Sequence, residues 1–247
     1  MPTISAVILT KNEARNIADC LASVRWADEV LVLDSFSTDD TVAIAQAQGA
    51  RLAQRAFQDW ANQRNAALDL AVGEWVFFVD ADERATPELA AEIRGVSAQD
   101  SPVGWWVPRR NYIFGQWIRH AGWSPDYQLR LLRRGRARYD PTRPVHELVL
   151  LDGEDGHLQN PLLHYNYDRL SQFIAKQNRY TSLEARELQA KGIRARPWSP
   201  ILQPWREFWR RYVTLEGYKD GGHGLLLSLL MAYYSGVTYV KLWRLGK

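Results

Sequence analysis

The stretch Trp75-Val76-Phe77-Phe78-Val79-Asp80-Ala81-Asp82 joins a run of aromatic and β-branched residues to two aspartates. Residues of this kind favour strands, and a continuous apolar run is typical of a strand buried on both faces. We therefore predict a central strand over 75–79. Asp80 and Asp82 would then be fixed at its carboxyl end, where two carboxylates can hold a divalent cation. The alternative, that Asp82 only caps the next helix, is weaker because Thr86-Pro87 already supplies an N-cap and a first turn.

Strands and helices alternate on the amino-terminal side of this strand. Short apolar runs predict strands at 4–9 and 30–33, and apolar residues at helical spacing predict helices at 13–24, 41–48 and 59–71. Such alternation predicts an α/β fold, in which a mainly parallel, Rossmann-like sheet has helices on both faces.

The pattern changes after residue 104. Short runs at 105–108, 128–132 and 147–151 predict an antiparallel addition to the sheet, and a long helix is expected at 168–190. We therefore predict two domains, an α/β domain over 1–165 and a helical, basic and aromatic C-terminal extension over 166–247.

Prolines and apolar residues dominate the end of this extension. Residues 197–204 predict a linker, and Pro204 is well placed as the first residue of a helix with an aromatic stripe. The uncharged run 225–240 is shorter than the roughly 20 apolar residues that a membrane span needs. An interfacial or packed hairpin is therefore expected there.

Charge is distributed unevenly along the chain. Residues 1–100 hold 8 Lys and Arg against 16 Asp and Glu, whereas residues 101–247 hold 23 against 12, together with eight of the eleven tryptophans. Arginine with tryptophan suits an anionic lipid surface, although the same residues could simply pack a small domain. A single cysteine, Cys20, excludes an intrachain disulfide. With no basic leader at the N-terminus, we expect a cytoplasmic protein that contacts the inner face of the membrane.

Polar segments follow three of the predicted strands. They are Thr10-Lys11-Asn12-Glu13, the segment 34–40, and Asp80-Ala81-Asp82-Glu83. Ligands of such sheets bind beyond the carboxyl ends of the strands, so these segments predict the binding edge.

In this order, the three segments resemble those of the family 2 glycosyltransferases, which have the GT-A fold. The resemblance implies that Thr10, Asn12, Glu13, Asp34 and Ser35 contact the nucleotide. It also implies that Asp80 and Asp82 form a DxD motif, which holds Mg²⁺ or Mn²⁺ against the diphosphate of the donor. The chain departs from many relatives at Asp34-Ser35, where they carry two adjacent acids.

A polar triplet, Gln63-Arg64-Asn65, lies on the helix predicted before the central strand. Relatives often have a similar triplet, which implies that Arg64 approaches the donor phosphates or base and that Asn65 lies near the sugar. The alternative is that Arg64 belongs to a solvated helix face.

Inverting transfer needs a base that deprotonates the acceptor hydroxyl. The family places this acid downstream of the DxD motif, which here implies Asp126, followed by Tyr127-Gln128-Leu129-Arg130-Leu131. The histidine expected some twenty residues later corresponds to His146, which becomes a third metal or phosphate contact. Glu147, beside it, is the rival base.

Five arginines between residues 130 and 138 form a basic run that could meet an anionic acceptor. Nucleic acid is disfavoured as a partner because the predicted pocket is acidic and no recognition motif is present. With the segment Gly217-Tyr218-Lys219-Asp220-Gly221, the chain most resembles bacterial lipopolysaccharide core glucosyltransferases. That implies transfer of a hexose, glucose from UDP-glucose, to a lipopolysaccharide inner-core or other lipid-linked saccharide.

Two other functions compete with this interpretation. A sugar-phosphate nucleotidyltransferase would also combine an α/β sheet with metal-binding acids, but it usually has a glycine-rich loop after the first strand, and residues 10–16 contain no glycine. A non-enzymatic membrane adaptor would bind vesicles without metal-dependent affinity for a nucleotide sugar.

Overall fold

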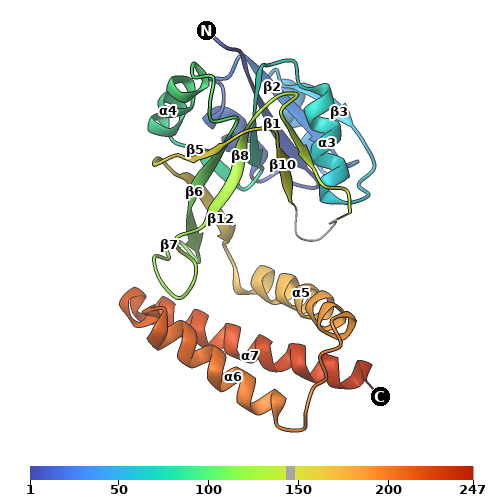
Figure 1. Ribbon diagram of the computed structural model, residues 1–247, viewed down its shortest axis with the longest axis vertical. Helices are drawn as coiled ribbons and strands as arrows, with labels where there is room; N and C mark the ends of the chain where they lie inside the picture. The colour runs from blue at the N-terminus through green and yellow to red at the C-terminus, as the bar shows by residue number, and fades with distance from the viewer. Residues whose placement is uncertain (143–147, 247) are drawn as a thin grey trace. The chain divides into compact units, whose positions relative to one another are not determined.

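Four parallel strands form the amino-terminal part of the sheet in the computed structural model, which describes residues 1–142 and 148–246 (Figure 1). Their order in space is β3 (Arg51–Gln54), β2 (Glu29–Asp34), β1 (Ile4–Thr10) and β4 (Trp75–Asp80). All seven residues of β1 are buried, as expected for a strand covered on both faces. The predicted parallel sheet is confirmed.

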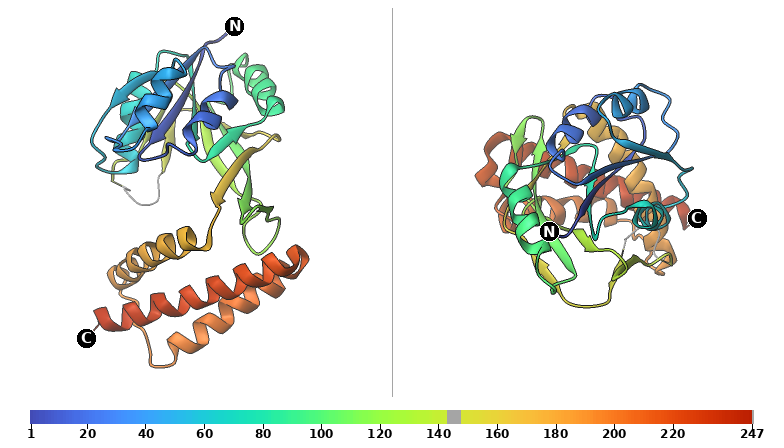
Figure 2. Two further views of the ribbon diagram at one scale, coloured as in Figure 1. Left: turned by 180° about the vertical axis from the view of Figure 1, so that it is seen from behind. Right: turned by 90° about the horizontal axis from the view of Figure 1, so that it is seen from above.

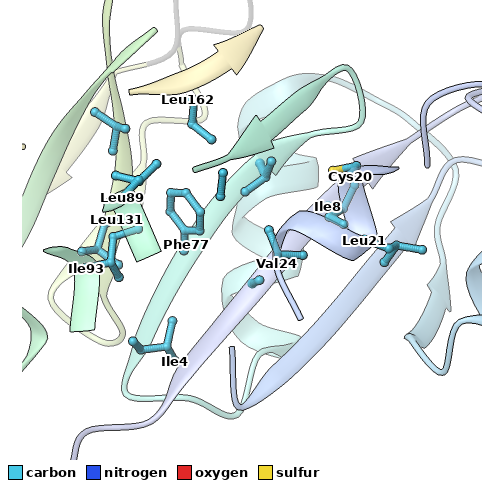
Figure 3. Packing of buried hydrophobic residues seen from close by; sticks show 14 of the residues in the cluster. Ile4, Ile8, Cys20, Leu21, Val24, Phe77, Leu89, Ile93, Leu131 and Leu162 are labelled. Atoms are coloured by element: carbon cyan, nitrogen blue, oxygen red, sulfur yellow. The ribbon is translucent and has the colours of Figure 1, made fainter. Parts of the chain in front are cut away.

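Helices pack on both faces of these strands. Phe77 faces a cluster that includes residues of α1 (Ile17–Ser23) and α4 (Pro87–Ser97), shown in Figure 3. The next residue, Phe78, faces a second cluster that includes α3 (Trp60–Leu70). Alternation along a strand thus divides one apolar run between two cores. The remaining helix of this part is α2 (Thr41–Ala47).

A mostly antiparallel set of strands extends the sheet beyond β4, as predicted for the runs 105–108 and 128–132. The run predicted at 147–151 is not part of this sheet, because its residues 149–151 belong to a separate two-stranded sheet. β8 (Tyr127–Arg133) pairs antiparallel with both β4 and β6 (Gly104–Ile113), and β12 (Leu162–Tyr167) joins β6 to β5 (Glu83–Ala85). The smaller strands are β7 (Gln116–Trp117) and β11 (Asp155–His157) beside β6, and the separate pair β9 (Ala137–Tyr139) and β10 (Val149–Leu151).

The first predicted helix is shorter than its sequence pattern indicates. It begins at Ile17, not at Glu13. Asn12 has a left-handed backbone, with φ of 56°, and the Glu13 N–H donates to Thr41 Oγ1 at 2.8 Å. The Glu13 N–H therefore bonds to the start of α2, and residues 14–16 form only a turn that is closed on the Glu13 carbonyl.

Contacts divide the chain into two compact units. The first contains residues 1–109 and 126–164, and the second contains residues 110–125 and the chain from residue 165 onward. In the second unit, α5 (Leu170–Ala190) and α6 (Ser199–Trp209) both pack on the long helix α7 (Gly221–Leu245). A π-turn (Arg210–Thr214) and a 3₁₀ turn (Gly217–Asp220) connect α6 to α7. Figure 2 shows α6 and α7 running along each other.

The end of the chain differs from its predicted arrangement in two respects. The predicted linker 197–204 is wrong, because α6 begins at Ser199 and Pro204 lies inside it. Pro200 occupies the first turn, where a missing N–H costs no helical bond. The run 225–240 is part of the single helix α7 and not a hairpin of its own. By length and composition the helical stretch 217–245 is able to cross a membrane, with a mean hydropathy of 1.4 over a window that is 39% buried.

Gly236 allows α6 and α7 to approach closely. A Cβ atom at Gly236 would lie 2.9 Å from Pro204 Cγ and 3.3 Å from the Pro200 carbonyl oxygen. Gly222, near the start of the same helix, has nothing within 4 Å of the corresponding position.

We expect Gly236→Val to destabilise the protein by about 1–3 kcal/mol, because the added methyl groups must push α6 away. Gly222→Val is the matched control and should change stability by less than about 0.5 kcal/mol. Urea unfolding followed by circular dichroism measures both. Equal stability of the two variants would show that α6 and α7 do not pack at Gly236.

Candidate active site

The carboxyl ends of three parallel strands bring the predicted polar segments to one edge of the sheet. In the register of the sheet, Thr10 lies beside Asp34, and Leu9 lies beside Asp80. The segments that follow β1, β2 and β4 therefore start side by side, as expected for a ligand-binding edge.

Asp34 is fully buried and is held by several donors. It accepts hydrogen bonds from Thr10 Oγ1 at 3.1 Å, from the Ser37 N–H at 2.9 Å and from Gln54 Nε2 at 3.0 Å. Burial raises the pKa of Asp34, but the bonds from Ser37, Gln54 and Thr10 outweigh it and lower that pKa. Asp34 is thus a charged, rigid acceptor at the end of β2.

The loops after β1 and β2 are bonded to each other. The Asn12 N–H donates to Ser37 Oγ at 2.8 Å, and Asn12 Oδ1 accepts from the Thr38 N–H at 2.8 Å. Ser35 Oγ accepts a bond from Gln63 Nε2 of α3 at 3.2 Å. The structure thus brings Thr10, Asn12, Asp34 and Ser35 together, and their contacts with a nucleotide stay a prediction.

Asp82 and His164 form a pair at the end of β4. His164 Nε2 lies 3.4 Å from Asp82 Oδ2, and His164 is only 6% exposed. His164 reaches this position because β12 pairs with β5, with His164 opposite Glu83. His164 could not be predicted from the sequence, since nothing near it in the chain indicates that pairing.

Negative charge gathers around this pair. The pKa of Glu13 is raised by burial and then by the charges of Asp82, Asp39 and Asp80, against a lowering hydrogen bond with Asn16. A divalent cation at Asp82 would relieve this repulsion, and carboxylate and imidazole are suitable ligands for it. Across residues 1–142 and 148–246, no group of three or more His, Cys, Asp or Glu side chains forms a metal site by itself. Asp82 and His164 therefore fit a cation that takes its other ligands from elsewhere, such as a donor diphosphate.

Asp80 contacts two buried guanidinium groups. Arg130 Nη1 donates to Asp80 Oδ1 at 3.2 Å, Arg130 Nη2 donates to Oδ2, and Arg64 Nη2 lies 3.4 Å from Oδ1. Burial raises the pKa of Asp80, but the charges of Arg130 and Arg64 outweigh it and hold that pKa far below its usual range. Of the two DxD aspartates, Asp82 is thus better placed to bind a cation.

Arg64 is buried and does not belong to a solvated helix face. It is 6% exposed, and its guanidinium lies 5.2 Å from the ring centre of Phe78 and 5.7 Å from that of Tyr139. Its neighbour Asn65 bonds to both backbone groups of Tyr139, each at 2.9 Å. The structure thus shows Asn65 attaching α3 to β9, and its predicted place near the sugar remains untested.

Asp126 is held by an arginine from the neighbouring strand. Arg109 contacts Asp126 Oδ2 through Nε at 2.9 Å and Nη2 at 2.8 Å, while Gln128 Nε2 donates to Oδ1 at 3.0 Å. Arg109 Nη1 also donates to Glu83 Oε1 at 3.2 Å. Asp126 is therefore more than a simple turn acid. His146 and Glu147 lie outside the described residues.

The arginines from 130 to 138 do not form one basic surface. Arg130 points to the buried acids, whereas the others contact separate partners near the surface. Those partners are Asp100 for Arg133, the Gly73 carbonyl for Arg134, Asp152 for Arg136 and Asp69 for Arg138. Alternation along β8 and the following turn disperses a run that is continuous in the sequence.

Known proteins similar to this chain point to one family. Residues 5–146 match the family model "Glycosyl transferase family 2". Over 250 residues the chain is 32% identical to the lipopolysaccharide core biosynthesis glycosyltransferase LpsC of Rhizobium meliloti (strain 1021), covering 98% of this chain and 92% of LpsC. An uncharacterized glycosyltransferase of Rickettsia felis is 29% identical over 258 residues, covering 98% of this chain and 90% of that protein.

A solved structure confirms the fold. TarS residues 1–349 of S. aureus, in complex with UDP, is similar with a TM-score of 0.50 and 14% identity, covering 98% of this chain and 89% of that chain. The likeness agrees with the expected GT-A arrangement of sheet and helices. Neither competing function, nucleotidyltransferase or adaptor, is supported by these matches. Because the family match extends over more than half of the chain, and the match to LpsC over nearly all of it, this protein belongs to the family 2 glycosyltransferases and resembles those of lipopolysaccharide core biosynthesis.

Proposed function

We propose that this protein is an inverting, divalent-metal-dependent hexosyltransferase that takes glucose from UDP-glucose. The observation that carries the proposal is the Asp82–His164 pair beside the acidic strand ends. A carboxylate and an imidazole in such surroundings are suitable ligands for a cation that also binds a diphosphate. Family membership supports glycosyl transfer in general; the donor, the metal and the acceptor are the proposed parts.

The donor nucleotide is proposed to bind along the edge formed by Thr10, Asn12, Glu13, Asp34 and Ser35. Asp34 is charged and bonds to Thr10 and Ser37, so it holds the loops after β1 and β2 in place for a ribose or base. Arg64 and Asp80 lie beside this edge, where a guanidinium group is able to approach the donor phosphates.

Mg²⁺ or Mn²⁺ is proposed to bind Asp82 and His164, with Asp80 held nearby and His146 as a further candidate contact. A bound cation would neutralise the charge that develops on the departing diphosphate. The chain itself supplies the ligands and fixes their orientation, since His164 is buried and Asp82 follows a rigid strand.

Asp126 is proposed as the base. It takes the proton of the acceptor hydroxyl while the hydroxyl oxygen bonds to the anomeric carbon, and the bond from that carbon to the diphosphate oxygen breaks. UDP leaves with the bonding electrons, and the configuration at the anomeric carbon inverts. Glu147 remains the second candidate for this role.

The acceptor is proposed to be a lipopolysaccharide inner-core or other lipid-linked saccharide at the inner face of the cytoplasmic membrane. The name of LpsC supports this class of acceptor. The second unit supports contact with lipid, because residues 193–247 hold nine Lys and Arg against three Asp and Glu. Large apolar side chains with a helical pattern of spacing are exposed on α6 and at the residue just before it, namely Trp198, Ile201, Leu202, Trp205 and Trp209.

The Asp82–His164 pair predicts metal-dependent donor binding. Asp82→Asn and His164→Asn should each weaken the Mn²⁺-dependent affinity for UDP-glucose by about 10–100-fold, because each removes a proposed ligand or its orientation. Asp100→Asn, at an exposed acid far from the strand ends, is the control. Calorimetric titration with and without Mn²⁺ measures the effect. If the first two variants bind like the control, the proposed metal site is wrong.

Replacing the two candidate bases distinguishes them. Asp126→Asn should lower kcat by about 10²–10⁴-fold with donor affinity unchanged, because amide nitrogen and oxygen cannot take the proton. Glu147→Gln is the matched comparison and should keep most of the rate. Transfer rates at saturating donor give the answer, and normal turnover by Asp126→Asn would exclude Asp126 as the base.

Binding to lipid is predicted to depend on α6. The double variant Trp205→Ala/Trp209→Ala should reduce co-sedimentation with phosphatidylglycerol vesicles at least about tenfold, since it removes two exposed aromatic side chains. Trp60→Ala, an exposed tryptophan of the first unit, should leave binding unchanged. Salt should weaken binding of the unaltered protein. Equal binding by both variants would rule out α6 as the contact.

A further inference from the structure

Arg109 connects the proposed base to the segment that follows β4. Its Nε and Nη2 both bond to Asp126 Oδ2, and its Nη1 bonds to Glu83 Oε1. The backbone N–H of Arg109 also donates to the Asp126 carbonyl at 2.7 Å. One residue thus fixes both the side chain and the main chain of Asp126.

The connection continues from Glu83 to the DxD motif. Arg130 Nη2 donates to the same Glu83 Oε1 at 2.9 Å and also bonds to Asp80. Glu83 Oε2 accepts the Asp80 N–H at 2.9 Å. Acids and arginines therefore alternate in one bonded series, which runs through Asp80, Arg130, Glu83, Arg109 and Asp126.

Burial makes this series rigid. The Glu83 side chain is 0% exposed and that of Arg130 is 4% exposed, whereas Arg109 and Asp126 are 17% and 22% exposed. Ions in such surroundings must keep their partners, because an unpaired buried charge is very unfavourable. Glu83 and Arg130 thus form the fixed end, and Arg109 extends from that end toward the more exposed Asp126.

We propose that Arg109 is a positioning residue, which sets the place of the Asp126 carboxylate relative to the DxD segment through Glu83. This inference rests on the proposed role of Asp126 as the base. Inverting displacement requires the acceptor oxygen, the anomeric carbon and the leaving oxygen in line, and a misplacement of about 1 Å can cost roughly 10²-fold in rate. Arg109 does not touch the reacting atoms; it acts through Asp126.

Arg109→Ala should lower kcat about 10²-fold, while the KM for UDP-glucose and its Mn²⁺-dependent affinity change less than about threefold. Guanidine added to the solution should restore part of the rate of Arg109→Ala, because it can occupy the space of the missing group. It should restore none to Asp126→Asn. Arg136→Ala, at a surface arginine that contacts Asp152, is the control and should keep the full rate.

Adding Arg109→Ala to Asp126→Asn shows whether Arg109 acts through Asp126. If it does, the double variant should be no more than about threefold slower than Asp126→Asn alone, because a residue's effect is lost when its target is absent. A further loss of tenfold or more, or a normal kcat for Arg109→Ala while Asp126→Asn is inactive, would overturn the inference. Normal turnover by Asp126→Asn would instead overturn the base assignment.

If Arg109→Ala does not fold, Arg109→Lys tests the positioning role of Arg109 instead. Lysine keeps the charge but cannot form two bonds to Asp126 and a third to Glu83. We expect a kcat at least about tenfold below that of the unaltered protein with an unchanged KM for the donor. A normal kcat for Arg109→Lys would contradict the positioning role.

Discussion

The buried contact of Arg130 with Asp80 and Glu83 is the constraint on which the rest of the site depends. Burial disfavours the Arg130 charge, but Asp80 and Glu83 outweigh this and hold the pKa of Arg130 well above its usual value. Removing one partner of such a buried group typically costs about 3–5 kcal/mol. Because Arg130 lies on β8, Asp80 ends β4 and Glu83 begins β5, the contact joins the antiparallel addition to the parallel strands. The turn carrying Asp82 is thereby fixed beside His164.

This arrangement explains how one GT-A sheet can position both the segments proposed to bind the donor and the residues around the proposed base. The parallel strands end in the segments proposed to bind the donor. The antiparallel strands supply Arg130, Arg109 and His164, and Asp126 lies directly before β8. The positive charges of the arginines offset the negative charges of the acids that they contact. The region around Asp80 therefore contains many charged groups but has little net negative charge. The net negative charge remains around Glu13 and Asp82, where a cation is proposed.

Much of the first unit could be predicted from sequence because its signals are local. The run 75–79 is a strand that packs against one hydrophobic cluster on each of its faces, and Asp80 and Asp82 follow this run as expected. Glu83, Arg109 and His164 could not be placed, since their contacts depend on pairing between segments that are far apart in the chain, as for His164 and Glu83, which are 81 residues apart. Pro204 was predicted to begin a helix because a proline inside a helix is rare. It lies inside α6 instead, where Gly236 of α7 leaves room for its ring. The bonds from the Asn12 N–H to Ser37 and from the Glu13 N–H to Thr41 likewise explain why the helix starts later than the apolar spacing indicates.

Asp82 and His164 are proposed to hold the cation that binds the donor diphosphate. A crystal grown with UDP and Mn²⁺ and measured at the manganese absorption edge tests it most directly. We expect one anomalous peak within coordination distance of Asp82, His164 and the diphosphate. A peak bound elsewhere, or UDP bound at this edge without manganese, would contradict it.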